Sequence, residues 1–314
     1  MRYAHALATR LLMRALVIGA SGQVGAALLT TLSARGHDAR GTYGHSAAPG
    51  LDPLDVSDLT AVARAVGAVR PDWVFCPAGL SHVDYCEDHV DEAMAANRDG
   101  PEAAARAAEW AGAGFVFYSS DYVFDGVAGP FSENDTPRPL SVYGRSKHEG
   151  ERAVLVACRR AVVIRTSVVY GPERQEKNFV YQLIRACRAG QPFRPAVDQR
   201  ASPSYNPDVA AASVELCERE LLGLWHVAGS EVLDRYAFAL LTCKEFGLDA
   251  SRLTAVTTAA LGQKASRPLD GGLKVAKAQA RLTTRLRGAA EGLHAMREAL
   301  ERGRTGVDQP RNIK

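Results

Sequence analysis

Residues 14–25 decide the fold, and they read RALVIGASGQVG. A short apolar run leads directly into three glycines at three-residue spacing, and residues of helical periodicity follow. Glycines at a strand-to-helix turn let the backbone bend tightly and approach a pyrophosphate, and they aim the helix N-terminus at the phosphates. The stretch therefore predicts the first β-α unit of a dinucleotide-binding fold. The residues expected to line the cofactor here are Gly19, Ser21, Gly22, Gln23, Val24 and Gly25.

Outward from this turn, short apolar runs alternate with longer segments of helical period, which is the pattern of β-α-β units around a parallel sheet. We expect strands at 15–18, 39–43, 73–76, 115–118, 161–165 and 223–228. We expect helices at 24–34, 59–69, 90–111, 142–157, 179–188, 209–219, 235–246 and 281–302. The predicted fold class is α/β: a doubly wound parallel sheet of the Rossmann type with a smaller mixed α/β lobe.

The rhythm of the elements loosens after residue 172, and this predicts two interleaved domains. The predicted division is 13–172 plus about 206–230 for a dinucleotide-binding domain, and about 173–205 plus 231–303 for a substrate-binding lobe. The return to the first domain rests on the late strand at 223–228. The ends, 1–12 and 304–314, are expected to be flexible extensions.

The composition excludes several classes of protein. The chain has 314 residues, 46% of them apolar, and a formal net charge of +3. Charges of both signs are interleaved, so the chain lacks the basic stripe of a nucleic-acid-binding protein. Its six cysteines have no spacing typical of a metal site or a redox pair, and no run approaches the ~18 apolar residues of a membrane span. We expect a cytoplasmic protein that binds no nucleic acid, membrane or metal, and that can form a homodimer.

The end of the second strand bears on the choice of cofactor. In NAD-binding proteins an acidic residue there pairs with the ribose hydroxyls, but the stretch 41–46, GTYGHS, has none. Thr42, His45 and Ser46 can instead donate to a 2′-phosphate. The sequence therefore favours NADPH, with NADH as the open alternative. An ordinary solvated loop is an equally good interpretation of His45.

A short extended piece follows, and it ends at Asp55 and Val56. We expect these two residues to hold the adenine edge of the cofactor. The alternative is that Ser57 or Asp58 simply caps the helix that comes next.

A tyrosine and a lysine four residues apart carry the candidate chemistry. Tyr143 and Lys147 begin an amphipathic helix, so they share one face. An ammonium beside a phenol, together with an oxidised nicotinamide, lowers the pKa of the phenol and makes it a general acid and base. One unit earlier, a strand ends at Ser120, where a hydroxyl faces the ligand crevice of a doubly wound sheet. Ser120 can hydrogen-bond a substrate carbonyl while Tyr143 protonates it.

Four stretches together carry a family resemblance. They are the glycine turn at 19–25, the run SSDYVFDG at 119–126, PLSVYGRSK at 139–147 and RTSVVYG at 165–171. The glycine turn, together with Ser120, Tyr143 and Lys147, resembles the extended short-chain dehydrogenases/reductases. The whole set is similar to the dTDP-4-dehydrorhamnose reductases over about residues 13–282. That resemblance implies an NAD(P)-dependent reductase of a nucleotide-linked 4-keto-6-deoxy sugar.

The resemblance also implies roles for single residues. Ser120 stands at the family's catalytic hydroxyl, Tyr143 is the acid, and Lys147 holds the ribose and tunes Tyr143. The cofactor-side positions that it adds are Pro77, Ala78, Gly79 and Asn97. The residues expected to face the substrate are Ser120, Asp121, Tyr122, Val168 and Gln199.

Departures from the family pattern leave the substrate open. Val168 stands where the reductases commonly have a tryptophan, and DQRASP at 198–203 matches their D-Q-x-G-x-P loop only in part. Sugar-nucleotide dehydratases carry Asp-Glu after the strand-end hydroxyl, but here Tyr122 follows Asp121, which disfavours dehydration. The sequence is also similar to the regulatory beta subunit of methionine adenosyltransferase. That likeness implies a non-catalytic, cofactor-binding alternative, and a sugar-nucleotide epimerase is a further one.

Three other features have mainly structural interpretations. His82 lies near the cofactor-side loop but is more simply a structural histidine. Tyr85, Glu87 and Asp88 fit a solvated helix start. Arg267 is the exception, because it can meet the diphosphate of a sugar nucleotide.

Overall fold

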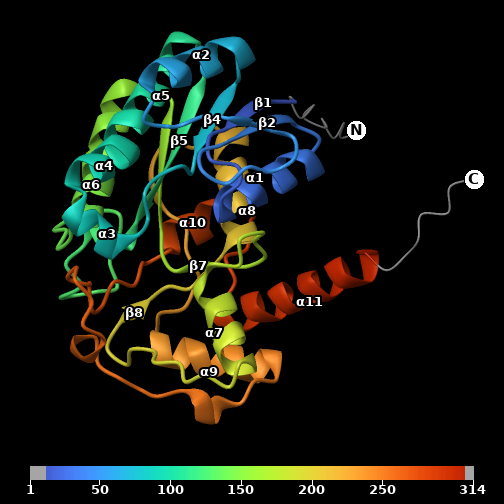
Figure 1. Cartoon of the computed structure of the whole chain (residues 1–314). Helices are drawn as coiled ribbons and strands as arrows, with labels where there is room; N and C mark the ends of the chain where they lie inside the picture. The colour runs from blue at the N-terminus through green and yellow to red at the C-terminus, as the bar shows by residue number, and fades with distance from the viewer. Residues whose placement is uncertain (1–11, 308–314) are drawn as a thin grey trace, which may run out of the picture.

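The computed structural model describes residues 12–307, and side chains up to residue 302. Most of the extensions expected at 1–12 and 304–314 lies outside the described residues, but residues 304–307 belong to the helix Ala289–Val307 and so depart from the expected flexible end. A twisted sheet forms the upper part of the molecule, and a smaller group of helices lies below it (Figure 1).

The main sheet has seven strands in the order β10-β6-β5-β4-β1-β2-β3, and each neighbouring pair is parallel. The strands are β1 (Arg14–Val17), β2 (Asp38–Tyr43), β3 (Leu51–Pro53), β4 (Trp73–Cys76), β5 (Gly114–Ser120), β6 (Ala161–Thr166) and β10 (Gly223–His226). The α/β fold with a parallel sheet is confirmed. The last strand pairs with β6, so the chain returns to the sheet late, as the apolar run at 223–228 predicts.

Alternation of side chains along β5 builds two separate cores. Phe115 and Phe117 point to one face of the sheet, and Val116 and Tyr118 point to the other. Because all four are buried, the strand is apolar throughout, as expected for a strand with helices on both sides. The first face packs against α2 (Leu59–Val69), α5 (Gly100–Trp110) and α6 (Val142–Ala157). The second packs against α1 (Gln23–Ala34), α8 (Asn206–Glu218) and α10 (Ala276–Arg281).

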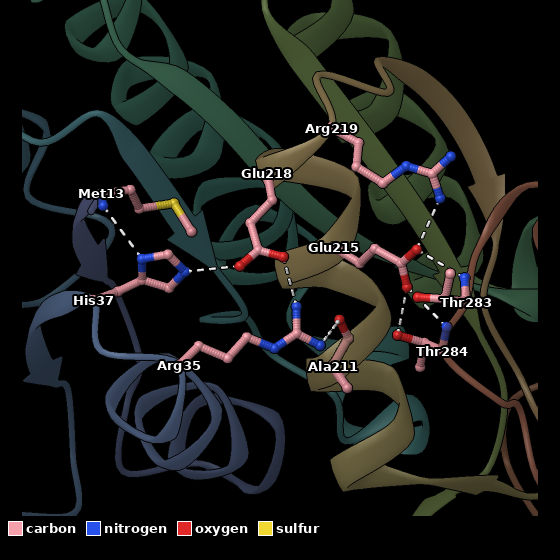
Figure 2. Close-up of polar contacts among 9 residues, drawn as sticks. All are labelled: Met13, Arg35, His37, Ala211, Glu215, Glu218, Arg219, Thr283 and Thr284. Carbon is pink, nitrogen blue, oxygen red and sulfur yellow. Dashed lines mark hydrogen bonds and ion pairs between the residues drawn. The ribbon is translucent and has the colours of Figure 1, made fainter. Parts of the chain in front are cut away.

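Helices α1 and α8 run parallel, because their matching ends are tied together. At the N-terminal ends, Asn206 Nδ2 donates to Gln23 O at 3.3 Å. At the C-terminal ends, Glu218 accepts from Arg35 at 2.8 Å and pairs with His37 Nε2 at 2.9 Å, as Figure 2 shows. Both helix N-termini therefore lie at the same edge of the sheet as the glycine turn.

A smaller lobe lies beyond that edge. It contains α7 (Phe179–Arg188), α9 (Arg235–Phe246) and α11 (Ala289–Val307), which share an apolar core. Two short sheets connect it, one of β7 (Val169–Tyr170) and β9 (Ser204–Tyr205), the other of β8 (Arg200–Ala201) and β11 (Leu233–Asp234). The remaining short elements are α3 (Val83–Asp88), α4 (Val90–Met94), η1 (Ala95–Asp99), η2 (Asp121–Val123), η3 (Ala250–Arg252) and η4 (Ala259–Leu261).

Two predicted helices differ from the structure. The segment 90–111 is not one regular α-helix, because η1 inserts a π-helical turn between α4 and α5. The helix expected at 281–302 begins only at Ala289, since Thr283 and Thr284 leave helical conformation to donate their backbone N–H groups to Glu215. Periodicity predicted the helices but not these tertiary interruptions.

Candidate active site

The glycine turn between β1 and α1 is shaped for a close backbone approach. Gly19 has φ +90°, and a Cβ there would lie 2.8 Å from the backbone N of Ala78. A Cβ at Gly25 would lie 2.3 Å from Gly19 O. Both positions therefore require glycine, because a side chain would push the turn away from β4 or from the helix.

The N-terminus of α1 opens at this turn without a side-chain cap. Gly22 is the N-cap residue and makes no side-chain hydrogen bond to the first turn. Its neighbours are held from the smaller lobe's side, since Gln175 Nε2 donates to Ser21 O at 3.2 Å and Asn206 Nδ2 donates to Gln23 O. The buried Gln23 Nε2 has no partner among the described residues. Uncapped N–H groups and a helix dipole suit a pyrophosphate, so this cradle fits a dinucleotide.

The residues expected at the adenosine end divide into buried and exposed ones. Thr42 is buried under the turn, where its Oγ1 accepts from Gly19 N at 3.4 Å. His45 is exposed, and its charge helps to lower the pKa of Asp55, after the larger effect of two hydrogen bonds from Ser57. Ser46 is half-buried. A 2′-phosphate at this end would meet His45 and Ser46 before Thr42.

The other predictions at this end have clear local outcomes. Asp58 caps α2 by accepting from Ala61 N at 2.9 Å, which confirms the capping alternative for that residue. The Asp55 carboxylate accepts from Ser57 N and Oγ, so it is fixed in a turn. Val56 is buried, and its carbonyl lies against Gly100 at the start of α5.

Next to the glycine turn, the loop after β4 leads to a buried asparagine. Pro77 and Ala78 follow the strand, and a Cβ at Gly79 would lie 2.6 Å from Asn97 Oδ1 and 2.9 Å from Lys147 Nζ. Asn97 lies in the π-helical turn η1, a geometry that often occurs at functional sites. The space beside Gly79 is thus bordered by an amide and an ammonium.

Asn97 links this loop to the catalytic helix. Its side chain pairs with both backbone groups of Leu80, at 3.0 Å to N and 2.9 Å to O. Its Nδ2 also reaches Ser146 Oγ at 3.0 Å, and that hydroxyl donates to Tyr143 O at 2.8 Å. Asn97 therefore ties the cofactor-side loop to the first turn of α6.

The predicted catalytic residues meet at the end of β5. Ser120 is its last residue, Tyr143 and Lys147 lie on one face of α6, and the Lys147 ammonium donates to Tyr118 O at 3.1 Å. The Ser120 hydroxyl donates to Asp121 Oδ1 at 2.9 Å and accepts from Tyr122 N at 3.2 Å. The structure thus brings the three residues to one edge of the sheet.

Burial is the main influence on the electrostatics of Tyr143. Burial raises the pKa of its phenol above the ordinary value, and a hydrogen bond with Ser120 only partly opposes this. The Lys147 ammonium is turned towards Tyr118 O. Burial also lowers the pKa of Lys147 to about 8. In the protein alone, Tyr143 is therefore a neutral phenol that holds its proton at neutral pH.

Asp121 is buried beside this group. Its Oδ1 accepts from Ser120, and its Oδ2 accepts from Ser167 Oγ at 2.6 Å. Burial raises the pKa of Asp121, and the two serine hydrogen bonds work against that rise. Asp121 thus fixes the Ser120 hydroxyl from behind.

An arginine from the smaller lobe reaches the same site. The guanidinium of Arg267 lies 5.9 Å from the Tyr122 ring, which makes an edge contact with Tyr143 at 5.5 Å. Arg267 Nη2 pairs with Asp84 at 2.9 Å, whereas its buried Nε has no partner among the described residues. A buried cation on Tyr122, the ring that contacts Tyr143, suits an anionic ligand.

Val168 and Gln199 are the two remaining residues predicted to face the substrate. Val168 has φ +43°, which is a strained conformation for a β-branched residue. Gln199 is buried and donates from Nε2 to Gln263 Oε1 at 3.1 Å. Val168 follows Ser167, the partner of Asp121, whereas the Gln199 side chain is bonded to Gln263, 64 residues further along the chain.

The structural interpretations near α3 hold in part. His82 caps α3, because its Nδ1 accepts from Tyr85 N at 3.1 Å. Asp88 is exposed to solvent and pairs with Lys264. Glu87 departs from the expected solvated role: its Oε1 accepts from Val142 N at 2.8 Å and supports the start of α6.

Sequence reasoning missed a buried ion pair behind the catalytic helix. Glu151 is four residues past Lys147 and binds Arg165 of β6 through two contacts of 2.7 Å. Both side chains are almost completely buried. The signal was the extended spacing Tyr143-x-x-x-Lys147-x-x-x-Glu151, which places all three on one helix face.

Within residues 12–307, no cluster of three or more histidine, cysteine or acidic side chains is arranged to hold a metal ion. In the same part of the chain, no helix has both the length and the apolarity needed to cross a bilayer.

Known proteins share this architecture. A family model described as the RmlD substrate binding domain matches residues 13–302. The spore coat polysaccharide biosynthesis protein SpsK of Bacillus subtilis is 33% identical over 81% of this chain and 87% of its own length. Methionine adenosyltransferase 2 subunit beta of Danio rerio is 32% identical over 84% of this chain and 83% of its own. The crystal structure of a dTDP-4-dehydrorhamnose reductase from Bacillus anthracis, in complex with NADP, has a TM-score of 0.85, with 26% identity, 92% of this chain covered and 100% of that chain.

Proposed function

The chain belongs to the family of the RmlD substrate-binding domain, and from this premise we propose that it is an NADPH-preferring reductase of a nucleotide-linked 4-keto-6-deoxy sugar. The family includes NAD(P)-dependent sugar-nucleotide reductases, and the solved relative carries NADP. The observation that carries the proposal is the meeting of Ser120, Tyr143 and Lys147 at the end of β5, beside the uncapped N-terminus of α1.

The cofactor would be held by the two borders of the crevice. The α1 N-terminus would bind its pyrophosphate, and Asn97 and Lys147 would border its ribose beside Gly79. When bound, a reduced nicotinamide supplies the hydride. His45 and Ser46, with no carboxylate at that end of β2, support the preference for NADPH.

Tyr143 would supply the proton. Its raised pKa keeps the phenol protonated at neutral pH, so it can donate to the ketone oxygen as that oxygen gains negative charge. Ser120 would donate a second hydrogen bond to the same oxygen after turning from Asp121, 2.9 Å away. Two oriented donors stabilise the developing alkoxide more than the ketone, which lowers the barrier.

Arg267 supports an anionic substrate. Its guanidinium is buried next to Tyr122, and its unpaired Nε is a donor that a phosphate oxygen would satisfy. We propose that the smaller lobe, about 173–205 and 231–303, selects this substrate. The domain of 13–172 and about 206–230 would bind the cofactor.

Turnover of candidate substrates tests the proposal. Purified protein should consume NADPH only when a 4-keto sugar nucleotide is present, and Tyr143→Phe should reduce kcat by about 10³-fold because the proton donor is lost. Binding of NADPH, followed by fluorescence titration, should be retained. Tyr85→Phe is the control, since that exposed hydroxyl bonds to Glu92 at 3.0 Å. Wild-type turnover by Tyr143→Phe contradicts the assignment.

A second candidate function is a cofactor-binding regulatory subunit. The likeness to the methionine adenosyltransferase subunit favours it, and Val168 in place of an aromatic residue is compatible with it. Such a protein would bind NADP tightly, reduce no keto sugar and co-purify with another enzyme. Substrate-dependent NADPH consumption excludes this alternative.

A further inference from the structure

The buried pair of Glu151 and Arg165 lies directly behind the catalytic lysine. Glu151 is one helical turn beyond Lys147 on the face of α6 that packs on the sheet. Arg165 binds both carboxylate oxygens at 2.7 Å, and its guanidinium lies 5.0 Å from the Phe124 ring. The side chains are only 4% and 3% exposed. Since such pairs seldom increase stability over apolar residues, their position next to a functional group calls for another account.

Three titratable groups face the Lys147 ammonium from the elements packed around it: Cys76 at the end of β4, Cys86 of α3 and Glu151 of α6. Burial raises the pKa of Cys76 to about 12 and also raises that of Cys86, so both are neutral thiols at neutral pH. Burial alone would raise the pKa of Glu151, but hydrogen bonds from Arg165 and His148 help to bring it below the ordinary value. Glu151 is thus the one negative charge among these three neighbours.

Burial opposes the charge on Lys147 and lowers its pKa to about 8. A neutral amine would weaken the hydrogen bond to Tyr118 O and would no longer stabilise negative charge in the crevice. The carboxylate of Glu151 works against this loss, because an opposite charge nearby favours the ammonium. Arg165 prevents the carboxylate from turning away or taking up a proton.

We propose that Glu151 is a positioning residue: its carboxylate, fixed by Arg165, keeps the Lys147 side chain charged and directed at the carbonyl of Tyr118. His148 Nδ1 lies 3.4 Å from Oε2 of the same carboxylate. The expected change in the pH dependence of kcat/KM rests on the proposed reductase function, whereas the charge on Lys147 does not depend on that function.

Direct titration of Lys147 tests the proposal without any substrate. The chain has seven lysines, so the side-chain signals of protein with ¹³C-labelled lysine are few, and Lys147→Met assigns the relevant one. Glu151→Gln removes the charge but keeps the shape. We expect the Lys147 pKa to fall by about 1 unit, because the carboxylate is lost and the charge of Arg165 is no longer neutralised.

Two control variants separate this effect from others. Glu149→Gln removes the same charge from the exposed face of the same helix and should leave the Lys147 pKa unchanged. Glu215→Gln disturbs a buried carboxylate of α8 and should lower stability without moving that pKa. A folded Glu151→Gln protein whose Lys147 titrates as in the Glu149→Gln protein overturns the proposal.

If Glu151→Gln does not fold, the double variant Glu151→Gln/Arg165→Gln decides, since it leaves no unpaired buried charge. The Lys147 pKa should still fall in it, by less than about 1 unit, because the charge of Arg165 is removed together with the carboxylate; an unchanged value refutes the proposal. In the reductase assay, the alkaline limb of kcat/KM should move to lower pH by the same shift. Absence of turnover in the wild-type protein contradicts the proposed function alone, because the titration of Lys147 stands independently.

Discussion

Two glutamates, one on each side of the main sheet, are buried and are kept ionised by hydrogen bonds, but their surroundings differ. Glu215 of α8 accepts from Thr283 N, Thr284 N and Thr284 Oγ1 at 2.7 to 2.8 Å (Figure 2). Glu151 of α6 is held by Arg165. Burial tends to raise both pKa values, and hydrogen bonds reverse this, to about 2 for Glu215.

The two carboxylates differ in what surrounds them. The neighbours of Glu215 are backbone N–H groups, a hydroxyl and the part-exposed Arg219, none of which changes charge near neutral pH. The neighbour of Glu151 is an amine whose pKa is about 8. The carboxylate of Glu215 therefore holds the backbone at Thr283 and Thr284 in place. The carboxylate of Glu151 instead favours the protonated form of Lys147.

The largest expected effect comes from removing the partner of Glu151. Arg165→Ala leaves a carboxylate buried without its bidentate partner and should lower the free energy of unfolding by about 3 to 5 kcal/mol. Chemical denaturation measures this. Glu151 would then take up a proton more readily, so the Lys147 titration should move as in Glu151→Gln/Arg165→Gln, by less than in Glu151→Gln. Stability within about 1 kcal/mol of wild type contradicts this account of the pair.

The second largest effect is expected in the pH dependence of the free energy of unfolding, through Glu215. Its pKa is about 2 in the folded protein and 4.5 ordinarily, so its contribution is fully present above about pH 5 and is lost as the pH falls towards 2. The shift corresponds to about 3 kcal/mol at most. Unfolding at a series of pH values should therefore show a shallower acid decline for Glu215→Gln than for wild type. Parallel curves for the two proteins would mean that this carboxylate is not linked to folding.

The smallest effect is expected for the arginine beside Glu215. The Arg219 side chain is 43% exposed, and Glu215 keeps its other donors without it. Arg219→Ala should therefore lower the free energy of unfolding by less than about 1 kcal/mol, in contrast to Arg165→Ala. Thermal melting of the two variants side by side makes the comparison. Equal losses would show that burial does not distinguish the pairs.

Much of the site was predictable because its signals are local. The glycine turn, the strand ending at Ser120 and the helix face with Tyr143 and Lys147 each follow from spacing within a few residues. The helices at 59–69, 142–157, 179–188 and 235–246 were predicted at their observed bounds, because each has a strong amphipathic period or a cap. The charge state of Tyr143 in the protein alone could not be predicted in this way, because it depends on burial.

The missed features join segments that are far apart in sequence. Arg267 meets Asp84, and Asn206 meets Gln23, across more than 180 residues in each case. The break between α10 and α11 has the same origin, because Glu215 draws Thr283 and Thr284 out of helical conformation. No local pattern contains such partners.

The sequence by itself determined the β-α order and the glycine turn, and it predicted which side chains we propose to be catalytic, because backbone geometry and side-chain period are set over a few residues. Only the tertiary structure decided which charges those side chains carry. Packing α6 against β6 places Arg165 opposite Glu151 and thereby sets a fixed negative charge beside Lys147. The free energy of a charge depends on burial and on neighbours, and those arise only when distant strands and helices meet.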